Sequence, residues 1–233
     1  RLEKRLKKEQ IDYVMMKTDG FHFAQQGIAD LYLSLFQRFD HTEQKRKQAV
    51  GILGAHCFSS FQKEEMEDCA TNIKKVGYET VWPEKESLSE IEGLKNTVCN
   101  WVVASEGIPV ARYLSHKYNI PYMIGIPAGK KLSSDWQTYL TEGKWNISSQ
   151  AQSRQAKKKK VLLIGDPAVT WGIAKYLMET ETAELVFAVY TQLVSSRRWY
   201  TETLRGTEEH WLGGHNPVKE IQYFKDRTEL KVL

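Results

Sequence analysis

The sequence predicts an α/β fold of Rossmann-like units with parallel sheets. Short apolar runs alternate with segments of helical period along most of the chain, as in strands joined by crossover helices. Residues 98–130 contain a complete strand, turn, helix, strand and loop, and a crossover of this kind joins parallel strands. Ligands of open parallel sheets collect outside the carboxyl ends of the strands, so a functional site is expected there.

The composition favours a globular protein and disfavours nucleic-acid binding. The 233 residues are 41% hydrophobic, which suits one large or two small domains. Much of the net charge of +4 sits at residues 1–8 and 157–160. A solvated tail and a linker explain these runs better than a nucleic-acid surface does, so we expect no nucleic-acid partner.

The cysteines and the hydropathy point to a cytoplasmic protein. Cys57, Cys69 and Cys99 are widely spaced and form no disulfide framework or zinc motif, and so low a count fits a reducing cytosol. Cys69 falls on the apolar face of a predicted helix, whereas Cys57 is either a reactive thiol or cluster ligand or, as we favour, a structural thiol. No apolar run approaches the ~20 residues of a membrane span, so no membrane association is expected. Because the chain begins at Arg1, we expect it to be a piece of a longer protein.

Residues 1–48 are predicted to end a preceding domain. The apolar run at residues 11–17 stops at a Thr-Asp-Gly turn and predicts a strand. From Ile28 to Phe39, apolar residues recur at helical spacing and predict one long helix.

Residues 49–130 are predicted to form a Rossmann-like α/β domain. Its expected strands are residues 49–53, 78–82, 98–104 and 120–124, and its expected helices are residues 64–76, 88–94 and 109–118. Ser87 and Glu90 have the spacing of a capping box, and Pro109 suits the first turn of a helix. Gly77 and Asn119 are expected to end helices in a left-handed conformation.

The rest of the chain is predicted to be a linker and a second unit. Residues 131–160 are polar and weakly periodic, which indicates a helical or irregular linker. Residues 161–233 are expected to start a further Rossmann-like domain. Its predicted elements are a strand at 161–164, a turn at 165–167, a helix at 168–178, a strand at 185–190 and a short strand at 220–224.

No catalytic motif accompanies this pattern. The chain has no GxGxxG, P-loop, GxSxG or HExxH sequence, so the candidate sites are positional. Four loops rich in small residues follow predicted strands, at residues 54–60, 105–107, 125–130 and 165–170, and their composition suits either ligand approach or ordinary turns. In the second of these loops, Glu106 is expected either to pair with Lys130 or Arg112 or to be solvated.

Two aromatic features also allow two interpretations. Trp101 lies within an apolar strand and is expected to be a core residue. The run at residues 197–200, Arg-Arg-Trp-Tyr, suits stacking on a flat ligand or base, but a helix with arginines along its surface explains it better.

The order of the segments resembles the nitrogenase component 1 family, which includes molybdenum–iron protein subunits and dark-operative protochlorophyllide reductase subunits. The most specific match is ARYLSHKYNIPYMIGIP at residues 111–127. The others are Asp19-Gly20-Phe21 with Gly27, VGILG at 50–54, KVGYETVWP at 75–83 and KVLLIGDP at 160–167. The resemblance implies a fragment that holds the family's second domain and part of its third.

The resemblance also implies a site, a cofactor and partners. It places the substrate or cofactor in the crevice facing Ser105, Glu106 and Gly107, which are our cofactor-binding candidates. The expected partners are an iron–sulfur ATPase reductase component and a homologous or identical subunit. An iron–sulfur cluster or metallocluster is expected in the full-length protein, held outside this fragment.

The chain departs from the family at one residue that bears on the chemistry. A cysteine of the molybdenum–iron protein that ligates the cofactor would fall at Val103, and valine cannot ligate a metal. Cys99 lies four residues earlier, about 13 Å away along an extended strand. We therefore expect no metal ligand and no catalytic residue in this fragment.

Three functions remain compatible with the sequence. The first is a subunit for ATP-driven reduction of an unknown substrate with the iron–sulfur partner, without nitrogen fixation. The alternative is a non-catalytic scaffold or carrier for a metallocluster or tetrapyrrole. A plain Rossmann-type domain for a nucleotide or sugar is a third, disfavoured by the missing glycine fingerprint.

Overall fold

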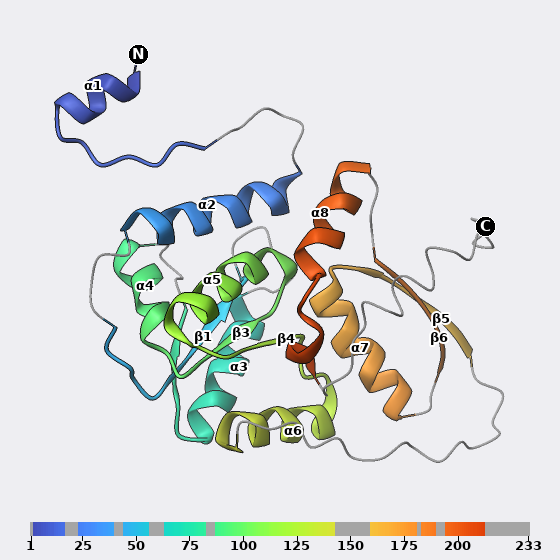
Figure 1. Ribbon diagram of the computed structural model, residues 1–233. Coiled ribbons are helices and arrows are strands. Elements are labelled where there is room, and N and C mark those ends of the chain that lie inside the picture. The colour runs from blue at the N-terminus through green and yellow to red at the C-terminus, as the bar shows by residue number, and fades with distance from the viewer. Residues whose placement is uncertain are drawn as a thin grey trace.

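The computed structural model describes residues 2–16, 23–39, 44–55, 63–82, 87–142, 159–180, 183–189 and 194–212. Within these ranges it contains a four-stranded parallel sheet and a two-stranded parallel sheet, each packed against helices (Figure 1). The predicted α/β class is confirmed. Across the described ranges, the helices are too short or too polar to cross a membrane.

The first sheet has the strand order β2-β1-β3-β4, with every neighbouring pair parallel. Its strands are β1 (Ala49–Leu53), β2 (Glu79–Val81), β3 (Cys99–Val102) and β4 (Tyr122–Ile124). Every residue of β1, β3 and β4 is buried, as expected of parallel strands covered on both faces. The predicted strands are confirmed in place, although β3 ends two residues earlier than the apolar run.

Helices lie on both sides of this sheet (Figure 1). In that view α2 (Ala24–Phe39), α4 (Leu88–Gly93) and α5 (Ile108–Tyr118) lie above it, and α3 (Lys63–Lys75) and α6 (Gly129–Glu142) lie below it. The capping box at Ser87 and Glu90 is formed, and Asn119 ends α5 in the left-handed region with φ 58°. The capping residues read from the sequence therefore predicted these two helix ends correctly.

The predicted strand at residues 11–17 is wrong. Helix α1 (Leu2–Lys8) precedes it, and residues 11–16 contain neither strand nor helix. Ile11 and Met15 are largely exposed, and in Figure 1 this segment and α1 stand apart from the sheet. A strand requires a partner for its backbone groups and its apolar face, and an apolar run alone provides neither.

The first part of the expected linker is α6, which covers the sheet. Trp136 and Leu140 are buried on one side of this helix, one turn apart. The Trp136 ring lies 5.0 Å from the ring of Trp101 between centroids, and the Tyr78 hydroxyl donates to the Leu140 carbonyl at 3.0 Å. Two buried residues were enough to anchor a segment whose average composition is polar. Residues 143–158 of the expected linker lie outside the described ranges.

The second unit consists of β5 (Lys159–Gly165), α7 (Pro167–Glu179) and β6 (Ala183–Val189). The two strands pair in parallel along their whole length, from Lys159 opposite Ala183 to Gly165 opposite Val189. The predicted strands and helix are confirmed. On one face of β5, Leu162 is 45% exposed and Ile164 is 55% exposed. The short strand expected at 220–224 lies outside the described residues.

After β6 the chain returns to the first unit through α8 (Val194–Leu204) and the short helix η3 (Glu208–His210). Trp211 then forms an isolated parallel bridge with Ile124, at the end of β4. The indole of Trp171 in α7 donates to the Leu212 carbonyl at 3.1 Å. Trp171, Trp211 and Leu212 belong to the same core as the first sheet, so the two units share buried surface.

Gly172 sets how closely α7 approaches the first unit. A Cβ atom added to Gly172 would collide with the carbonyl oxygen of Ile126, in the loop after β4. Gly27 is also helical, but a Cβ atom there would meet nothing within 4 Å. The two glycines therefore form a matched pair for testing this contact.

Substitution of Gly172 by Ala should destabilise the protein by about 1–3 kcal/mol, because the backbone of the 125–128 loop must move. Substitution of Gly27 by Ala should instead stabilise it by about 0.5–1 kcal/mol, because alanine favours the helix. Urea unfolding followed by far-ultraviolet circular dichroism measures both. A stable Gly172→Ala protein would contradict the close contact.

Candidate functional site

The candidate loop Ser105–Gly107 forms a short 3₁₀ helix, η2, between β3 and α5. It lies at the carboxyl end of β3, as the crossover pattern predicted. All three residues are buried, and Ser105 has no exposed surface. The loop is therefore an internal part of the fold, with little of it facing solvent.

Close packing of backbone explains the glycines at this edge. A Cβ atom on Gly107 would lie 2.7 Å from the carbonyl carbon of Leu53, and one on Gly54 would lie 2.7 Å from the carbonyl oxygen of Ala104. Gly54 also has φ +90°, a conformation that other residues rarely adopt. In the structure these small residues let the end of β1 lie directly against η2.

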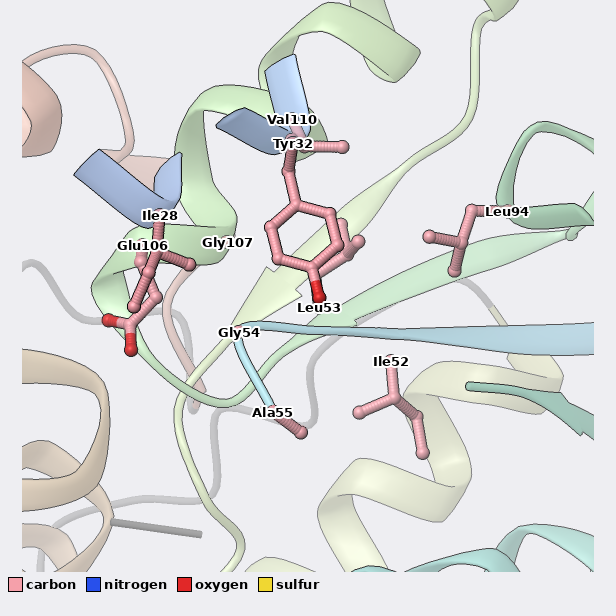
Figure 2. Close-up of a pocket in the computed structure, with 10 residues that line it drawn as sticks. All are labelled: Ile28, Tyr32, Ile52, Leu53, Gly54, Ala55, Leu94, Glu106, Gly107 and Val110. Atoms are coloured by element: carbon pink, nitrogen blue, oxygen red, sulfur yellow. The ribbon is translucent and has the colours of Figure 1, made fainter. Parts of the chain in front are cut away.

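A small, mostly apolar pocket lies where β1 ends, beneath α2 (Figure 2). Its volume is about 20 Å³, which is room for about one water molecule. Ile28 and Tyr32 of α2 cover it, and Figure 2 shows the Glu106 carboxylate beneath Ile28 and the Tyr32 hydroxyl above the Leu53–Gly54 backbone. The crevice expected at the strand ends is thus largely filled by α2.

Glu106 is 4% exposed, so the expectation that it is solvated is wrong. The expected pairing with Arg112 is also absent from the described contacts. The Arg112 guanidinium donates instead to the backbone carbonyls of Glu202 and Arg205, at the end of α8. The side chain of Lys130 lies outside the described part.

Ser105 contacts the second unit through Asp166. One carboxylate oxygen of Asp166, Oδ2, accepts hydrogen bonds from the Ser105 amide at 3.0 Å and from the Ser105 hydroxyl. The other, Oδ1, accepts from the Ala168 amide at 2.8 Å, in the first turn of α7. The loops after β3 and β5 therefore meet, which the sequence had not indicated. A signal for Asp166 was present, because an aspartate after a strand and before a helix suits an N-cap.

Two carboxyl groups and two hydroxyl groups influence one another at this contact. Burial, and then the charge of Glu106, raise the pKa of Asp166 to about 6, against the three hydrogen bonds donated to it. Burial, and then the charge of Asp166, raise the pKa of Tyr200 above its ordinary value, against a side-chain hydrogen bond with Ser105. We call Ser105, Glu106, Asp166 and Tyr200 the carboxyl cluster.

The other candidate loops are only partly described or are used for packing. Of residues 54–60, the structure describes 54 and 55, so His56 and Cys57 lie outside the described part. In the loop after β4, the Gly125 carbonyl accepts a hydrogen bond from the Trp101 indole at 2.7 Å. Trp101 has no exposed surface, so its predicted core role is confirmed.

Packing also explains the aromatic residues of the 197–200 run. Trp199 and Tyr200 are buried in α8, with their ring centroids 5.3 Å and 5.8 Å from that of Phe23. Arg198 is exposed and pairs with Glu202 at 2.9 Å, one helical turn away. The helical explanation is confirmed, and neither ring is open to a stacked ligand.

The described residues do not fit a metallocluster. Val103 is fully buried, and its amide donates to the Leu53 carbonyl at 2.9 Å. The Cys99 thiol is buried and points to the carbonyl of Asn100 at 3.7 Å, and burial raises its pKa to about 12. Cys69 packs against the core, as predicted. No three His, Cys, Asp or Glu side chains in the described ranges lie close enough to hold a metal ion.

Comparison with known proteins identifies one family. The model of the nitrogenase component 1 type oxidoreductases matches residues 2–228, nearly the whole chain. No curated protein matches the chain. The match agrees with the resemblance of the ordered segments from Asp19 to Pro167.

Cys99 should resist alkylation in the folded protein. Its raised pKa implies a thiolate fraction about a thousandfold below that of an ordinary thiol, and burial adds a steric barrier. Mass spectrometry after iodoacetamide treatment at pH 8 should show Cys69 modified well before Cys99. Both should react in guanidinium chloride, and rapid native modification of Cys99 would contradict its burial.

Asp166 should make the protein more stable at pH 5 than at pH 8. Its pKa is higher in the folded than in the unfolded chain, so its stabilising effect is complete below about pH 4 and is lost as the pH rises through about 6. The difference between pH 8 and pH 5 should be on the order of 1 kcal/mol. Urea unfolding at both pH values should show this difference in the free energy of unfolding for the wild type but not for Asp166→Asn. Asp68→Asn, at an exposed helical position, is the control and should behave as the wild type does.

Proposed function

The chain belongs to the nitrogenase component 1 type oxidoreductases, and from that premise we propose that it acts in an ATP-driven reduction with an iron–sulfur ATPase as its electron-donating partner. The family match over residues 2–228 is the observation that carries the proposal. An identical or homologous subunit would complete the assembly. The low cysteine count supports a cytoplasmic location.

Val103 supports a reaction other than nitrogen fixation. A buried aliphatic side chain occupies the position where the resemblance to the molybdenum–iron protein places a metal-ligating cysteine. Cys99 does not replace it, because its thiol is buried within β3 and its raised pKa favours the protonated form. In this proposal any iron–sulfur cluster or metallocluster is held by groups outside the described residues.

We place the substrate or cofactor beside Ser105, Glu106 and Gly107, at the carboxyl ends of β1 and β3. Glu106 lines the pocket there, which supports this assignment. The pocket holds about one water molecule, so a larger group would have to displace Ile28 and Tyr32 of α2. The proposed domain limits remain residues 1–48, 49–130, a linker at 131–160, and 161–233.

A second candidate is a non-catalytic scaffold or carrier for a metallocluster or tetrapyrrole. The observation that favours it is the enclosure of the candidate loop. Ser105 is engaged by Asp166 and Gly107 by the backbone of β1, so few groups of the loop are positioned to take part in chemistry.

The two candidates predict different behaviour of the protein purified anaerobically from its native source. A reductase subunit should contain iron by elemental analysis and absorb in the visible range. With dithionite, Mg-ATP and the iron–sulfur ATPase from the same organism, it should accept electrons only while ATP is hydrolysed. Omission of ATP and substitution of a non-hydrolysable analogue are the controls.

Each outcome decides between the proposals. Iron with ATP-dependent electron transfer supports the reductase, and a bound cluster or tetrapyrrole without transfer supports the scaffold. Protein without iron and without a chromophore overturns both. Reduction of dinitrogen to ammonia by the assembled components would overturn the exclusion of nitrogen fixation.

A further inference from the structure

We propose that an aromatic clasp on α8 holds the first two turns of α2, residues 24–30, closed over the candidate pocket, and that local opening of these turns gives access to it. The clasp consists of Trp199 and Tyr200, whose rings contact Phe23. That the pocket serves a substrate or cofactor rests on the proposed function, whereas the opening itself is a property of the fold.

The two halves of α2 pack in different hydrophobic clusters. In the second half, Phe36 is buried in the core of the first sheet, and Leu33 and Leu35 pack against that core. In the first half, Ala29 is buried in a separate cluster with the two rings of the clasp. A satellite cluster can separate while the main core stays intact. The first two turns can therefore open while the rest of α2 remains in place.

Two features of these turns lower the free energy of opening. Ile28 covers a pocket of about 20 Å³, so it has fewer contacts to lose than a side chain in a filled core. Gly27 lies in the same turns, and a Cβ atom there would meet nothing within 4 Å. Packing therefore does not require glycine at this position, and its effect is to weaken the helix.

Helix α8 is the fixed side of the clasp. At its end, Leu204 is buried in the core of the first sheet, and the Arg112 guanidinium of α5 donates to two backbone carbonyls. Figure 1 shows α8 beside the N-terminal end of α2. Because α8 is held by α5, opening separates Phe23 and Ala29 from the rings and leaves α8 in place.

Thiol alkylation tests the clasp in the whole chain. Val110 lines the pocket and is 1% exposed, so Val110→Cys introduces a thiol that opening of α2 makes accessible. Cys99 is buried in β3 and serves as the reference for global unfolding. Iodoacetamide labelling followed by mass spectrometry gives both rates in one sample. The introduced thiol should react at least about tenfold faster than Cys99, because local opening requires less free energy than global unfolding.

Three further substitutions, each combined with Val110→Cys, should change this ratio of rates differently. Trp199→Ala should raise it about tenfold, because the edge contact with Phe23, 5.3 Å between ring centroids, is lost. Trp199 is chosen because Tyr200 also interacts with the Ser105 side chain. Arg198→Ala, at the adjacent exposed position of α8, is the matched control and should leave the ratio unchanged. Gly27→Ala should lower the ratio about two- to fivefold by strengthening the helix.

Equal rates for the introduced thiol and Cys99 in the Val110→Cys protein overturn the proposal, because access to the pocket would then require global unfolding. A ratio that Trp199→Ala leaves unchanged also overturns it. If that variant does not fold, Phe23→Leu removes the other ring of the same contact and gives the same test. The alkylation ratio does not depend on iron or on electron transfer, so failure of the clasp and failure of the proposed function are distinguishable.

Discussion

The buried indole of Trp101 organises the edge at which the two units meet. It extends from the central strand β3, packs against Trp136 of α6 and donates its N–H to the carbonyl of Gly125, just beyond β4. Gly125 in turn faces Leu212 and Trp171, which belong to the part of the chain that follows the first sheet. One side chain thus fixes the covering helix, the exit of the neighbouring strand and the surface on which the second unit packs. Loss of that hydrogen bond would leave a polar group unsatisfied in the core.

This organisation explains why the carboxyl edge of the first sheet is closed. In an open parallel sheet that edge is the usual ligand site, because loops there can remain apart. Here α2 covers the end of β1, α7 and the Trp211 segment lie against the end of β4, and Asp166 reaches Ser105 between them. Glycines 54, 107 and 172 permit the approach, since a side chain at any of them would meet backbone. The edge at which the sequence places the candidate site is present, and its groups contact protein.

Most of the fold could be predicted from the sequence, because local patterns determine strands, helices and their ends. The capping box at Ser87 and the left-handed Asn119 act within a few residues of themselves. The errors arose where contacts with residues far away in the sequence determine the local structure. Residues 11–16 pair with no strand among the described residues. Helix α6, which contains the described start of the 131–160 segment, is anchored by Trp136 although that segment is polar on average. The candidate site shows the same division. The crossover pattern predicted the position of the loop Ser105–Gly107. The contacts of this loop with Asp166 and Tyr200 join distant parts of the chain, and no spacing pattern in the sequence predicts them.

The two-stranded sheet of β5 and β6 bears on how this protein can be handled. Leu162 and Ile164 are exposed on one of its faces, and among the described residues no third strand pairs with either edge. Open backbone groups beside apolar side chains are a template for association with another chain. A shortened protein that retains this sheet but loses its neighbours would therefore be prone to aggregate. Boundaries for expression are better placed outside the second unit than within it.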